Sequence, residues 1–235
     1  MSLVPANATA AANHTIKFLS TSVGRDRLNR FIQYLANFLA WYLANGKGEN
    51  DLVSRLAKLS LAVGQTRKLM RVGRQLEFVM TIAKSKGIKD DLLRYVAILK
   101  NLSLFGWLSH DMFQWAHSVG IVKLSNIKQI TERGMKCWLT ALCVSFIGGL
   151  YRLQINSIRL TQEHKAEKMG KEGGEKNVKL LQSERNRILL ALLQDGLDML
   201  LPGSALQYTT LNRGVVSAAG ITTSLIGGYL QWVSI

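Results

Sequence analysis

The chain has 235 residues, and thirty Lys and Arg outnumber fifteen Asp and Glu, which gives a formal charge of +15. The hydrophobic fraction of 48% excludes a disordered basic tail. Such a charge predicts an anionic partner, either lipid headgroups, nucleic acid or an acidic protein surface. Two cysteines, Cys137 and Cys143, provide no disulfide framework and match no zinc-binding pattern.

The fold class follows from the scarcity of helix-breaking residues and from the spacing of the apolar residues. The two prolines stand at Pro5 and Pro202, so nearly two hundred residues between them lack a strong helix breaker. Alternation with a period of two is almost absent. We therefore predict an all-α, membrane-associated protein with amphipathic interfacial helices and one or two transmembrane helices.

The N-terminal part divides into a flexible segment, 1–24, and a basic helical domain, 25–135. A helix is predicted over Arg25–Leu43 with an apolar stripe, and Ala44–Gly48 ends it. The next helix continues from about Asp51 to Lys84. Its apolar face changes register at Gly64–Gln65, which predicts a kink there. The stripe of the first helix consists of Leu28, Ile32, Leu35, Leu39 and Tyr42.

The stretch 66–84 combines an apolar face with a basic face. This pattern is typical of a helix that lies in a membrane interface, with cations on the headgroups of anionic lipids. A surface helix on a protein core shares the periodicity and is the alternative. The predicted lipid-binding residues are Arg67, Lys68, Leu69, Arg71, Val72, Arg74, Leu76, Val79 and Met80.

The middle of the chain is apolar but interrupted. From Asn101 to Val122 the only formal charge is Asp111, and polar neighbours favour a buried or interfacial helix. Cys137–Tyr151 has no charge but is only about 22 Å long as a helix, short of the roughly 30 Å hydrocarbon core. For 136–155, a short transmembrane helix and a core helix remain equal alternatives.

The C-terminal part begins with a charged, glycine-containing linker, 156–187, followed by an amphipathic helix, 188–202. Residues 214–235 carry no charge and are long enough to cross a bilayer, so they are predicted to form a transmembrane helix. A buried C-terminal helix is the alternative. Gly220, Ser224 and Gly228 recur every four residues, a small-residue seam that predicts self-association into a homo-oligomer.

The chain offers little for catalysis. His110, Asp111 and His117 lack further ligands at metal-binding spacing, and Asp195 with Asp198 is better explained by a solvated helix face. We predict no catalytic residue, no metal, no cofactor and no enzymatic activity. No zinc-finger, RNP or helix-turn-helix signature is present, so nucleic acid is not an expected partner.

Three stretches together resemble the peroxin-11 family of peroxisomal membrane proteins, namely Arg25–Leu43, Leu59–Phe78 and the aromatic-rich Leu102–Trp115. The resemblance implies membrane remodelling. The amphipathic helix would insert in the cytosolic leaflet, curve and elongate the membrane, and promote peroxisome division and proliferation. A pore-forming channel for small metabolites, using Asp111, Asp195 and Asp198, is the alternative.

The same resemblance implies the partners. They are anionic membrane lipids, further copies of the chain, a dynamin-related fission GTPase with its membrane adaptor, and the import receptor for peroxisomal membrane proteins. The implied location is the peroxisomal membrane.

Overall fold

A computed structural model describes residues 6–46, 49–169 and 174–235, and within these ranges the chain forms eight helices and no strand. The all-α prediction is therefore confirmed. The helices are α1 (Ala6–Ser20), α2 (Ser22–Asn45), α3 (Asn50–Met70), α4 (Gln75–Ser85), α5 (Asp91–Ser118), α6 (Ile127–Lys168), α7 (Gly174–Ala205) and α8 (Arg213–Ser234).

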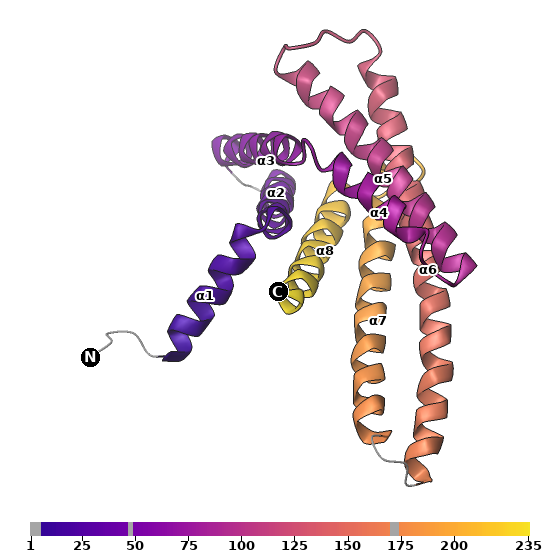
Figure 1. The fold of residues 1–235 in the computed structure, drawn as a ribbon. Helices are drawn as coiled ribbons and strands as arrows, with labels where there is room; N and C mark the ends of the chain where they lie inside the picture. The colour runs from indigo at the N-terminus through magenta and orange to yellow at the C-terminus, as the bar shows by residue number, and fades with distance from the viewer. Residues whose placement is uncertain (1–5, 47–48, 170–173) are drawn as a thin grey trace.

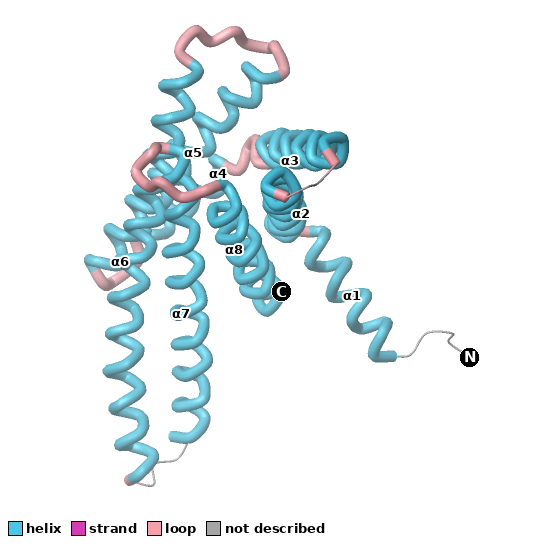
Figure 2. The backbone as a smooth tube through the Cα atoms, turned by 180° about the vertical axis from the view of Figure 1, so that it is seen from behind, coloured by secondary structure: helices cyan, strands magenta, loops and turns pink. Residues whose placement is uncertain are grey.

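A long antiparallel hairpin of α6 and α7 organises the fold (Figure 1). α5 packs on α6 and carries α4, while α8 lies between α7 and α2, and α3 lies across α2. Seen from behind, the far half of the hairpin projects beyond all the other helices (Figure 2). The remaining helices therefore meet at one end of the hairpin.

Two adjacent glycines let α6 contact two neighbours closely. A Cβ atom at Gly148 would overlap Val96 of α5, and one at Gly149 would lie 2.7 Å from Leu192 Cδ2 of α7. Backbones without side chains can approach closely, as is common where helices pack in lipid. These glycines place α5 and α7 on different sides of α6.

Two helices of the described chain, α6 and α7, are long and apolar enough to cross a membrane. The predicted segment 136–155 lies inside α6, and 188–202 lies inside α7. α8 covers the predicted 214–235 but is not one of these two helices, so its membrane span stays a prediction.

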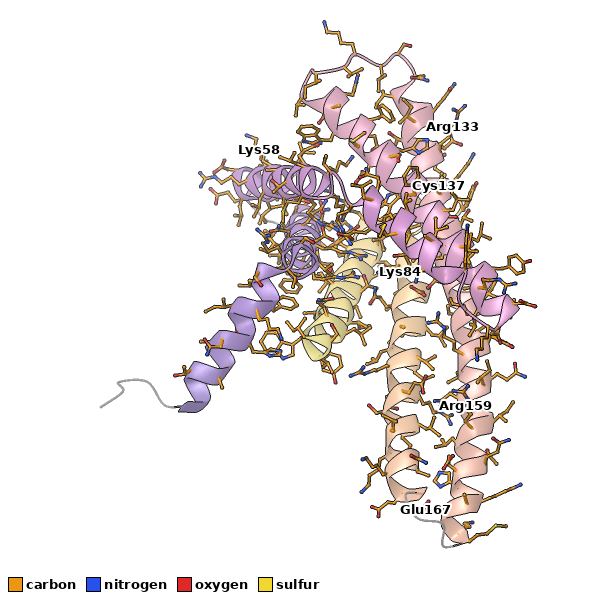
Figure 3. All side chains as sticks on the ribbon, viewed as in Figure 1. Lys58, Lys84, Arg133, Cys137, Arg159 and Glu167 are labelled. Carbon is orange, nitrogen blue, oxygen red and sulfur yellow. The ribbon has the colours of Figure 1, made fainter. Side chains whose placement is uncertain are left out.

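The predicted linker 156–187 is wrong where the structure describes it, because it is helical except at 170–173, which lie outside the described residues. A narrow seam holds the two helices together. Val178 and Leu160 are buried in it, and Asn156 Nδ2 donates a hydrogen bond to the carbonyl of Leu181 at 3.1 Å. Charged side chains such as Arg159 cover the rest (Figure 3).

The N-terminus also differs from the predicted flexible segment 1–24. From Ala6 onward it is helical, and the Thr21 hydroxyl caps α2 by accepting a hydrogen bond from Gly24 N at 2.9 Å. The ring of Trp232 on α8 packs against His14 and Phe18. The N-terminal segment was predicted to be flexible because its small polar residues indicated no packing partner, but α8 provides one. Residues 1–5 lie outside the described chain.

α2 turns its predicted apolar stripe outward. Leu28, Leu39 and Tyr42 are exposed, whereas Arg30 and Ala36 are buried. In water, apolar side chains that stay exposed contribute no hydrophobic stabilisation. In lipid the surroundings are themselves apolar, so the same exposure carries no free-energy penalty. The inverted distribution therefore fits a helix bundle whose surroundings are at least partly hydrocarbon.

Candidate membrane-binding face and buried ion-pair cluster

α4 packs on α5 with one side and leaves its other side uncovered. Leu76 is 71% exposed and Met80 60% exposed, with Val79 between them also at the surface. Leu69 and Val72, which precede α4, are exposed as well. The structure thus brings all five predicted apolar lipid-binding residues to the surface.

The predicted continuous helix over 66–84 is interrupted. α3 ends at Met70, residues 71–74 form turns, and α4 starts at Gln75. Gly73 has a φ of +87°, a backbone conformation that glycine adopts at little cost. The break therefore lies at 71–74, and α3 runs through the predicted kink at Gly64–Gln65.

The predicted basic face is mostly buried. Arg67 Nε lies 3.0 Å and Arg71 Nη2 3.1 Å from Asp26 Oδ1 on α2, and Arg67 also donates to Gln33 at 2.7 Å. Both guanidinium groups point into the protein, so in this structure they stabilise the junction of α2 and α3 rather than face headgroups.

A second carboxylate completes this cluster from α5. Asp111 accepts ion pairs from Arg71 at 3.4 Å and from Lys68 at 3.3 Å. The guanidinium of Arg71 also lies over the ring of Trp107, 5.1 Å from its centroid. Of the four predicted cations, Arg74 alone pairs outside the cluster, with Glu77 at 3.2 Å.

Opposing effects set the charge state of the cluster. Burial alone raises the pKa of Asp26, but Arg71 and Arg67 outweigh it and hold the pKa well below its usual range. Burial, together with the like charge of Arg71, lowers the pKa of Arg67 to about 10. Asp26 and Arg67 are therefore both ionised near neutral pH.

A further buried pair joins three helices. Arg30 on α2 forms an ion pair with Asp198 on α7 and donates a hydrogen bond to Thr223 Oγ1 on α8 at 3.0 Å. The sequence analysis missed Asp26 and Arg30 as functional residues. Their partners lie 41 or more residues away in sequence, so no local pattern marks either residue.

The predicted self-association seam on α8 is largely used within the chain. Gly220 lies against the ring of Tyr34 on α2, and Ser224 is buried. At Gly228, by contrast, a Cβ atom would meet nothing within 4 Å among the described residues. Self-association stays a prediction, and a seam of all three residues is not exposed in this structure.

Comparisons with known proteins agree with this membrane architecture. The profile of the family described as "Peroxisomal biogenesis factor 11 (PEX11)" matches residues 12–232. The chain is 30% identical to Peroxisomal biogenesis factor 11 of Schizosaccharomyces pombe, over 94% of each chain.

More distant relatives span the same length. Peroxisomal membrane protein PMP27 of Saccharomyces cerevisiae is 26% identical over 92% of each chain. Peroxisomal membrane protein 11A of Homo sapiens is 25% identical over 90% of this chain and 92% of its own. No solved structure matches significantly. The chain therefore belongs to the PEX11 family and is a protein of the peroxisomal membrane.

Proposed function

We propose that this chain remodels the peroxisomal membrane by inserting the exposed apolar face of α4 into the cytosolic leaflet, so that the membrane curves, elongates and becomes ready for division. The observation that carries the proposal is the exposure of Leu76, Val79 and Met80 on a helix whose opposite side packs on α5. Burial of apolar area supplies about 25 cal/mol per Å².

The headgroup contacts of this proposal come from different cations than those predicted from the sequence. Lys84, Lys86 and Lys89 at the end of α4 are exposed (Lys84 is labelled in Figure 3). Each cation near an anionic surface adds about 1 kcal/mol. Arg67 and Arg71 instead fix the turn from which α4 departs, because their side chains bind Asp26.

The test reconstitutes the full chain in liposomes that contain about one third phosphatidylserine, and electron microscopy follows liposome shape. The wild type is expected to form tubules, and the double variant Leu76→Glu, Met80→Glu to leave liposomes round. Leu180→Glu is the matched control, since Leu180 is 68% exposed on the projecting hairpin. Equal tubulation by the double variant and the wild type would refute insertion of α4.

Recruitment belongs to the same proposal. A curved membrane that carries many copies of the chain is the substrate on which a dynamin-related fission GTPase and its adaptor would act. The basic-apolar segment around α4 is also the proposed contact of the import receptor. Targeting and remodelling are separated by testing the α4 variant in purified liposomes, where no import takes place.

A further inference from the structure

A cavity of about 390 Å³ lies at the junction where α2, α3, α4, α5, α6 and α7 meet. Seven Lys and Arg side chains line it, against four Asp, an excess of three positive charges. The lining of the cavity is therefore strongly positive.

Three of the four carboxylates are already engaged in ion pairs. Asp26 and Asp111 bind cations of α3 and the turn after it, and Asp198 binds Arg30. The fourth, Asp195, has no Lys or Arg nitrogen within 4.0 Å in the part of the chain that the structure describes. The carboxylates of the cavity therefore leave its positive charge incompletely balanced.

Arg27 and Lys100 are the two lining cations that have not yet been assigned an ion pair. Neither forms an ion pair within 4.0 Å among the described residues, although Asp195 attracts both at longer range. Lys100 Nζ donates a hydrogen bond to Ser145 Oγ at 2.8 Å. Arg27 lies against α8, where a Cβ atom at Gly227 would be 2.7 Å from its Cζ. A cation that loses water without gaining an anion is costly.

We propose that this cavity binds a phosphate-bearing anion, and that Arg27 and Lys100 contact its oxygens. Guanidinium groups bind phosphate through paired N–H donors, and Lys adds a compact positive charge. A phosphomonoester carries up to two negative charges, which would offset most of the positive excess of the lining. The volume is within the range of small-ligand pockets. An anionic lipid headgroup and a soluble phosphate compound share this chemistry.

The test measures thermal unfolding of the purified full chain in a neutral maltoside detergent at constant ionic strength, with pyrophosphate or dihexanoyl phosphatidic acid as probe. Ligand that binds only the folded chain raises Tm in a saturable way. A response to pyrophosphate identifies a soluble phosphate compound as the source. A response to the lipid alone identifies a headgroup.

Variants assign the response to this cavity. Arg27→Gln and Lys100→Gln are each expected to weaken the probe's affinity at least tenfold. The matched controls Arg55→Gln and Lys179→Gln remove exposed cations of α3 and α7 and are expected to leave affinity unchanged.

A second readout separates lost binding from lost folding. Without probe, each variant is expected to unfold in a single cooperative transition, as the wild type does, because both side chains are only partly buried. The proposal is overturned if neither probe shifts Tm, or if both variants respond to the probe as the wild type does. The exposed residues Leu76, Val79 and Met80 do not line this cavity, so such a result would leave the proposed remodelling untouched.

Discussion

α4 and α8 were both predicted from sequence to meet the membrane, and in the structure they differ in what their small residues do. Both helices leave large apolar residues at the surface, such as Leu76 on α4 and Leu225 on α8, but α8 also packs small residues closely on α2. Large apolar side chains gain by entering any apolar phase, so an uncovered face of them suits lipid. A small-residue face gains only from close contact with another backbone, and here the same chain supplies it.

The largest expected effect is on the cluster that anchors the turn before α4. Asp26→Ala leaves Arg67 and Arg71 without their shared carboxylate, and loss of one partner of a buried pair costs about 3–5 kcal/mol. The free energy of unfolding in detergent, from denaturant titration, measures this loss. The exposed ion pair at Asp51 provides the control, since Asp51→Ala is expected to change stability by less than about 1 kcal/mol. Similar small losses in both variants would contradict the anchoring role of Asp26.

The next effect concerns α8. Gly220→Leu forces a side chain into Tyr34 and is expected to destabilise the fold by about 1–3 kcal/mol or more. Gly228→Leu is the control on the same helix, because nothing within 4 Å meets its Cβ. Thermal unfolding of both variants gives the comparison. If Gly228→Leu proved the more damaging one, the small-residue face would be serving another copy rather than α2.

A smaller effect is expected from pH. The pKa of Asp26 is lower in the folded chain than in the unfolded chain. Its stabilising contribution is therefore complete above the unfolded value and is lost as pH falls through the folded one. Tm measured from about pH 5 to about pH 2 should decline, and Asp26→Asn should flatten this part of the profile. A decline of equal slope in the variant would assign the acid sensitivity to other carboxylates.

The smallest change in stability is expected on α4 itself. Leu76→Glu at a position 71% exposed should alter the free energy of unfolding by no more than about 0.5 kcal/mol. Denaturant unfolding of the detergent-solubilised variant measures it. A large loss would mean that α4 packs more tightly than its exposure indicates, and that lost tubulation reflects misfolding.

The helical class and the surface position of Leu76 and Met80 could be predicted because they depend on local periodicity. The burial of Arg67 and Arg71 could not, since it depends on Asp26, more than forty residues away in sequence. The hairpin beyond Tyr151 was missed for a related reason. Its seam uses few apolar residues, so its charged composition indicated a linker although a partner helix lay close by.

The α2 stripe shows a different limit. Its periodicity correctly marked a helix, but periodicity alone does not say whether the apolar face meets protein or lipid. The buried ion pair of Arg30 with Asp198 requires the polar face of α2 to turn inward, so the apolar face turns outward. The sequence distance between these two residues hides the pairing from any local pattern.

Arg71 has a mechanical consequence. It stands directly after α3, and its side chain binds carboxylates of α2 and α5 and covers an indole ring. If α4 inserts into lipid as proposed, a force on it would act next to this residue, whose ion pairs tie the glycine-containing turn to two other helices. The turn would then behave as a stiff joint rather than as a free hinge.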